Sequence, residues 1–159
     1  MPMVRETSIR EAIGHALWES HACIGQWAFC ACLAMLRKAL DLWSADYRDR
    51  HSLTFDNTLG ERDNLYWRLR KIASANVLYQ DSIHKIIDGI RLDANDAVHD
   101  SSVCSGGRAG TYDGPGIIAI RRPFERLHAL VVSLITTTMP GVSVVYSDES
   151  RWRSTPPEI

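Results

Sequence analysis

Five polar residues between positions 84 and 99 have types and a spacing that could perform chemistry. His84, Asp88, Arg91, Asn95 and His99 follow one another at steps of 4, 3, 4 and 4 residues. On a helix these steps place the side chains within about 80° of arc, on one stripe. The stripe lies beside the isoleucine face of the same segment, so we expect it at the edge of a buried core.

The chemistry that this stripe would support best is metal-independent cleavage of a phosphodiester. Histidine titrates near neutral pH, so His99 is a candidate general acid or base. Arg91 would stabilise the charge that builds on phosphorus, and Asn95 would position the scissile group. The pattern lacks a carboxylate cluster, so we expect neither a metal nor another cofactor.

The same stripe has a structural interpretation. Asp88 could pair with Arg91 at i, i+3 or with His84 at i, i+4, each pair contributing a few tenths of a kcal/mol, roughly. Asn95 and His99 could hold loop backbone or cap the helix end. Spacing alone favours this interpretation, because polar stripes are common at protein surfaces.

Other candidates are weaker. Arg121 and Arg122 form a basic pair that would meet phosphates or oppose neighbouring carboxylates, and with His84 and Asp88 they complete the candidate binding residues. His15 and His128 lie in apolar patterns and are expected in or beside the core. The four cysteines, Cys23, Cys30, Cys32 and Cys104, are expected to be free thiols.

Helical periodicity dominates the chain and predicts an all-α fold, an up-and-down bundle of four to five helices. The strongest period, from Phe29 to Trp43, predicts a central helix, and Gly89 is expected to let another helix approach closely. A capping-box spacing places the first helix start at Ser8, and Pro123 suits the first turn of the last helix. The remaining predicted helices begin near Leu65 and run from Asp81 to His99.

The length of 159 residues fits one domain, with the bundle over residues 1–140, a flexible glycine-rich loop at 101–120 and an extended tail at 141–159. The net charge of -1 provides no global attraction for nucleic acid, so such a role must rest on a local patch. No apolar run reaches the roughly 20 residues of a membrane span, and the N-terminus is unlike a signal peptide. A cytoplasmic protein is therefore expected.

Two segments resemble the HEPN superfamily, in particular a branch of unknown function associated with restriction and defence proteins. Ile-Arg-Leu-Asp-Ala-Asn-Asp-Ala-Val-His at 90–99 is similar to its closing motif, in which Arg91, Asn95 and His99 match and Ala94 replaces the usual glycine. Arg-Lys-Ala-Leu-Asp at 37–41 resembles the motif on its second helix. The resemblance covers about residues 8–138.

The resemblance implies a bundle that usually dimerises and two possible functions. One is a non-catalytic interaction module in a prokaryotic antiviral defence or RNA- or nucleotide-linked system, with a protein partner or RNA as its ligand. The other is a metal-independent endoribonuclease that uses Arg91 and His99 across a dimer interface. Arginine in the ribonucleases falls four to six residues before the histidine, whereas Arg91 is about 12 Å of helical rise from His99. This spacing favours the module.

Overall fold

The computed structural model describes residues 3–76, 79, 81–99 and 117–144, with side chains in 9–76, 79, 81–96 and 121–144. Within these ranges the chain is all-α and has no strand, which confirms the predicted fold class. A short 3₁₀ turn, Asn57–Leu59, lies in the loop after the second helix. The five helices are α1 (Met3–Gly25), α2 (Phe29–His51), α3 (Leu65–Ala75), α4 (Asp81–His99) and α5 (Ile117–Thr138).

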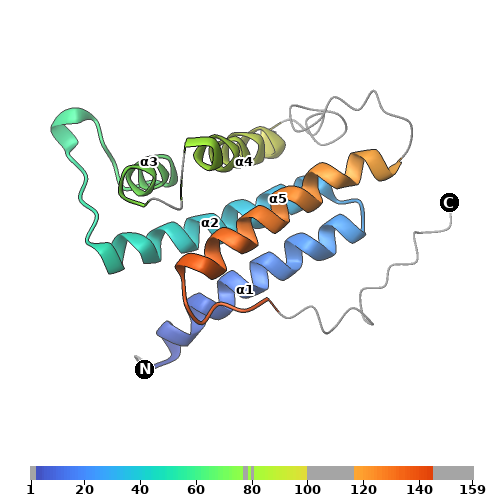
Figure 1. Ribbon diagram of the computed structural model, residues 1–159, viewed down its shortest axis with the longest axis horizontal. Coiled ribbons are helices and arrows are strands. Elements are labelled where there is room, and N and C mark those ends of the chain that lie inside the picture. The colour runs from blue at the N-terminus through green and yellow to red at the C-terminus, as the bar shows by residue number, and fades with distance from the viewer. Residues whose placement is uncertain (1–2, 77–78, 80, 100–116, 145–159) are drawn as a thin grey trace.

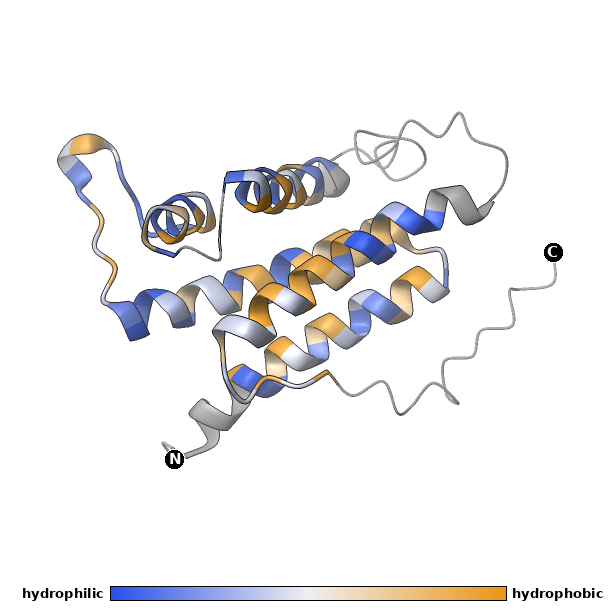
Figure 2. Ribbon diagram, viewed as in Figure 1, coloured by the Kyte–Doolittle hydropathy of each residue, from blue (hydrophilic) through white to orange (hydrophobic). Residues whose placement is uncertain are grey.

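Helix α2 is the central element, as its periodicity predicts. It contacts each of the other four helices, with α1 and α5 packed on one side and α3 and α4 covering another (Figure 1). Leu33, Leu36, Leu40 and Trp43 are fully buried along its inward face. Apolar residues gather where α2 and α5 pass each other (Figure 2). The bundle therefore forms around α2, which packs against one pair of helices on one side and a second pair on the other.

Two helix starts differ from the sequence prediction. Helix α1 begins at Met3, five residues before the capping box at Ser8, because the segment ahead of Ser8 contains no residue that breaks a helix after Pro2. Helix α5 begins at Ile117, so Pro123 lies inside it rather than in its first turn. Proline removes a single N–H donor, and the apolar run before it continues the helix. Helix α4 has the predicted bounds.

The chain that leaves α5 returns to α1. Val142 is buried, and Arg10 donates from Nε to the carbonyl of Pro140 at 3.0 Å. At Gly14 an added Cβ would lie only 2.7 Å from the carbonyl oxygen of Ser143. A side chain at position 14 would therefore push this segment away from the helix. The predicted flexible loop at 101–120 is wrong over 117–120, which form the first turn of α5, and its residues 101–116 lie outside the described ones. The predicted tail at 141–159 is described only over 141–144.

The cysteines correct one expectation. Cys32 is a buried free thiol and Cys23 is a free thiol at intermediate depth, as predicted. Cys30 is disulfide-bonded, which the expectation of four thiols missed. Burial raises the pKa of the Cys32 thiol to about 12, so it is protonated and unreactive at neutral pH. None of the described helices carries an apolar stretch that would cross a bilayer.

Candidate functional site

The polar stripe of α4 lies at the edge of the core, where the sequence predicts it. Ile87, Ile90 and Ala94 are buried on the inward face of the helix. The side chains of the stripe that the structure describes are half-buried beside that face. Each has a partner within the molecule, and the partners come from α4, α3, α2 and the segment before α4. The predicted position of the stripe at the edge of the core is therefore confirmed. The contacts of its individual side chains show which groups are engaged within the molecule.

Arg91 is held by two neighbours. Its Nε donates to Oδ1 of Asp88 at 2.7 Å, and its guanidinium carbon lies 5.0 Å from the centre of the Tyr66 ring on α3. The side chain is 15% exposed. The ion pair is the structural pairing at i, i+3 that the sequence predicts, and the ring contact adds a cation–π attraction. Arg91 thus links α4 to α3.

His84 contacts a residue outside the stripe. Its Nδ1 lies 3.0 Å from the hydroxyl of Tyr79, and the two rings meet edge-on. The predicted pairing of His84 with Asp88 is therefore replaced by a pairing with Tyr79. The Tyr79 ring is fully buried, and this burial, followed by the charge of Asp88, raises the pKa of its hydroxyl above the usual range. A neutral phenol is thus kept beside the imidazole.

Asn95 joins α4 to α2. Its Oδ1 accepts a hydrogen bond from the Nη1 of Arg37, and the contact is half-buried. Arg37 belongs to the segment 37–41, and Asn95 belongs to the segment 90–99. The two stretches of sequence that carry the HEPN resemblance therefore meet in space, although 58 positions separate these residues.

Among the described residues, no hydrogen bond or ion pair joins Arg121 or Arg122 to the α4 stripe. Arg121 on α5 forms an ion pair with Glu125 of the same helix, with Nε 2.6 Å from Oε1. Arg122 is exposed beside it. His99 is the last residue of α4, and its side chain lies outside the described ones. The proposed catalytic set of Arg91, Asn95 and His99 thus has two members that can be placed, both engaged with neighbours.

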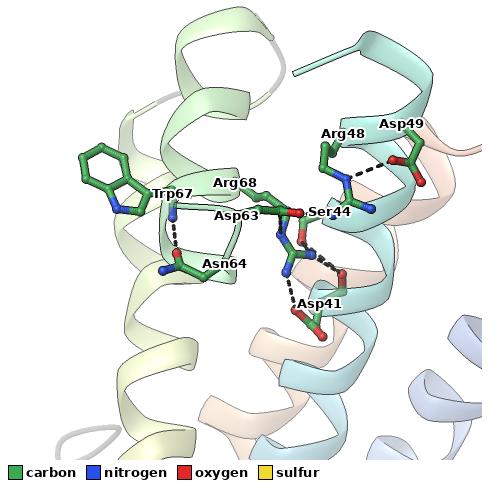
Figure 3. A network of polar contacts seen from close by, with 8 residues as sticks. All are labelled: Asp41, Ser44, Arg48, Asp49, Asp63, Asn64, Trp67 and Arg68. Carbon is green, nitrogen blue, oxygen red and sulfur yellow. Dashed lines mark hydrogen bonds and ion pairs between the residues drawn. The ribbon is translucent and has the colours of Figure 1, made fainter. Parts of the chain in front are cut away.

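A second polar cluster, centred on Arg68 of α3, was not predicted (Figure 3). Arg68 is only 8% exposed. Its Nη1 donates to the carbonyl of Asp41 at 3.0 Å and to the hydroxyl of Ser44 at 3.1 Å. Its Nη2 and Nε lie 3.0 and 3.2 Å from the carboxylates of Asp41 and Asp63. Arg68 therefore fastens α3 to α2 by charge and hydrogen bonds.

One sequence signal could have found this cluster. The buried residues of α3 are Leu65, Arg68, Leu69 and Ile72, which occupy one helical face. An arginine at an inward position of an apolar stripe is rarely buried unless carboxylates or carbonyls receive it. The partners themselves lie on α2 and could not be assigned from the sequence.

An open cleft of about 590 Å³ lies where α2, α3 and α4 meet. Its volume falls in the range of small-molecule sites. No group of three side chains suited to hold a metal is found among the described residues. The cleft is lined by Ala34, Arg37, Lys38, Asp41, Asp63, Asn64, Leu65, Arg68 and Ala94.

Comparison with protein-family models, with curated proteins and with solved structures found no match for this chain. The site is therefore interpreted from its own chemistry. Its described part offers guanidinium and ammonium groups, two carboxylates and an amide. Such a set binds and orients charged partners.

Proposed function

We propose that this protein is a HEPN-like helical interaction module, homodimeric, that works in a prokaryotic defence or RNA- or nucleotide-linked system. The observation that carries the proposal is the state of the α4 stripe. His84, Asp88, Arg91 and Asn95 each contact another side chain of the same molecule. Arg91 and Asn95 are the described residues that cleavage would require at the scissile phosphate. They are held by Asp88, Tyr66 and Arg37, and such satisfied polar groups are what an interaction module needs.

The surface that supports an interaction role lies on α3, and we define it by Tyr66, Trp67 and Arg70; we propose that it extends to Leu92 on α4, because the preceding Arg91 lies against the Tyr66 ring. The Arg70 guanidinium lies 5.4 Å from the Tyr66 ring and 5.7 Å from the Trp67 ring. Figure 3 shows the Trp67 side chain pointing away from the Arg68 cluster. Leu92 follows Arg91 and is 42% exposed. Tryptophan, tyrosine and arginine are the residues that contribute most at protein interfaces.

The homodimer is tested by measuring mass in solution against concentration. We expect a dimer for the wild-type protein, and Leu92→Glu should weaken it at least about tenfold, because a charge would be desolvated in the interface. Leu59→Glu is the matched control, since Leu59 is 73% exposed and belongs to the 3₁₀ turn rather than to α3 or α4. A wild-type protein that stays monomeric at high concentration would contradict the dimer.

Metal-independent endoribonuclease activity is the second candidate, using Arg91, Asn95 and His99. The observation that favours it is the cleft, because Ala94 lines it and Arg37, the partner of Asn95, lines it as well. The segment 90–99 thus borders the open cleft, whose lining includes three cationic side chains. For cleavage, the Nη donors of Arg91 would have to reach the phosphate while its Nε stays paired with Asp88.

The two candidates are separated by cleavage of single-stranded and transfer RNA in EDTA. The module predicts no cleavage at high protein concentration. Cleavage that is lost in His99→Ala, and retained in a control that removes the exposed His15, would replace the module by the ribonuclease. Circular dichroism and mass measured on both variants show whether they keep the fold and the assembly.

A further inference from the structure

The charges that line the cleft are unevenly compensated. Three cations and two carboxylates line it. Both carboxylates contact Arg68, and Asp63 also pairs with Arg48. Both carboxylates are therefore engaged by Arg68 of α3, although Asp41 itself lies on α2, and the two other cations are Arg37 and Lys38 of α2.

Arg37 has no carboxylate partner among the described residues. Its hydrogen bond runs from Nη1 to the neutral amide of Asn95, and the side chain is half-buried. A guanidinium carries five N–H donors, so most of its donors remain for another acceptor. The bond to Asn95 holds one edge of the group in place, which reduces the entropy lost when an anion binds the other edge.

Lys38 is the neighbouring cation and is exposed. In the described part of the chain no hydrogen bond or ion pair engages it, although Asp41 lies one helical turn away and lines the same cleft. The carboxylate of Asp41 is directed to Arg68 instead (Figure 3). The ammonium group is thus available to an incoming anion.

We infer that this cleft binds a phosphate group, with Arg37 as the planar donor and Lys38 as the mobile point charge. Arginine and lysine together recognise phosphate oxygens through charge-assisted hydrogen bonds. The N-terminus of α3, at Asn64 and Leu65, also borders the cleft, and its dipole favours the same sign of ligand. The phosphate is carried by a free nucleotide or by the backbone of an RNA, which share this chemistry.

This inference goes beyond the proposed function, because it concerns residues of α2 and holds for a module or an enzyme. The test is titration of the full chain at low salt with inorganic phosphate, adenosine 5′-monophosphate and a short single-stranded RNA. We expect saturable binding of at least one probe and about tenfold weaker binding by Lys38→Gln. Lys85→Gln removes the same charge from an exposed position of α4 outside the cleft, and should change affinity less than about twofold.

The outcomes separate the sources of phosphate. Tighter binding of the monophosphate than of the RNA assigns a free nucleotide, and the reverse order assigns an RNA backbone. Arg37→Lys should also weaken binding while the helical content is retained, because a lysine keeps the charge but loses the planar donor. The inference is overturned if no probe binds, or if Lys85→Gln weakens binding as much as Lys38→Gln. The mass of the dimer is measured in a separate experiment. The proposed homodimeric module can therefore be contradicted while the phosphate site is supported, and the phosphate site can be contradicted while the module is supported.

Discussion

The two sides of α2 share one apolar core and differ in what is added to it. Towards α1 and α5 the contacts are mostly apolar, as in the stacked rings of Phe29 and Phe124, whose centres lie 4.4 Å apart. Towards α3 and α4 the buried apolar residues of both helices are accompanied by arginines, which make the connections of Arg68 to Asp41 and of Arg37 to Asn95. Apolar burial is strong and non-directional, whereas a guanidinium needs specific acceptors.

The difference between the two sides of α2 indicates which contacts contribute to stability and which could recognise a ligand. Burial between α2 and α5 removes large side chains from water, which is the main favourable contribution to folding. Ion pairs that remain partly exposed contribute little, so the arginines of the α3–α4 side fix the arrangement of these helices while adding little to stability. A polar, open junction is also the place where a charged ligand or partner is recognised.

The largest effect is expected at the apolar contact. Phe124 is fully buried against Phe29, so Phe124→Ala should lower the free energy of unfolding by about 3–5 kcal/mol, since it loses burial and leaves a cavity. Chemical denaturation monitored by circular dichroism measures this. A loss below about 1 kcal/mol would show that the two sides of α2 do not differ in the way described.

The second effect is a pH dependence from His128. This residue is buried on α5, its Nδ1 lies 2.7 Å from the Ser20 hydroxyl of α1, and burial followed by the charge of His21 lowers its pKa to about 4. Below the ordinary pKa of about 6.5 the unfolded chain takes up a proton that the folded chain refuses. The free energy of unfolding should therefore fall by up to ~3 kcal/mol between pH 6.5 and 4.

Denaturation at stepped pH measures this dependence. His128→Gln should flatten it, because an amide can still meet Ser20 but does not titrate in this range. His15→Gln makes the same substitution at an exposed position of α1 and is the control. A slope that survives in His128→Gln would assign the effect to other groups.

A smaller loss is expected from Gly14→Ala. Alanine is the better helix former, yet its Cβ would lie 2.7 Å from the carbonyl oxygen of Ser143. Moving that backbone, together with the buried Val142, should cost about 1–2 kcal/mol in net stability. A thermal melt of the variant is sufficient, and a rise in Tm would contradict the close approach.

Arg68→Met should cost only about 1 kcal/mol although it removes every bond of the cluster. Methionine fills much of the same volume, Asp63 keeps Arg48, and the Asp41 carboxylate is more than half exposed. The exposed Arg70 gives the control substitution Arg70→Met. If Arg68→Met costs as much as Phe124→Ala, the junction is a stability element and the comparison fails.

The smallest effect has the opposite sign. No atom of the described residues lies within 4 Å of a Cβ built on Gly89, which shows that the predicted close helix approach at this glycine is wrong. Gly89→Ala should therefore stabilise the protein by about 0.5–1 kcal/mol through helix propensity alone. Its melt, compared with that of Gly14→Ala, tests both helices with the same chemical change.

Much of the fold could be predicted because helical periodicity is local. The apolar steps from Phe29 to Trp43 identify the central helix, and the bounds of α4 follow from one repeating pattern. The prediction from the sequence was wrong where a local rule for one residue competes with the helix propensity of the residues beside it. Pro123 permits a helix start, but the chain before it is equally helical. The position of the polar stripe followed from the α4 pattern, whereas the partner of His84 did not.

By itself the sequence determined which helices form, which faces are apolar and that one stripe on α4 is polar, because these properties depend on residues three or four positions apart. Only the tertiary structure decided which arginines meet which acceptors. The partners of Arg68 on α2 are 24 and 27 positions away, and that of Arg37 is 58 positions away. Such pairs depend on how helices pack, and helical spacing carries no information about contacts at that separation.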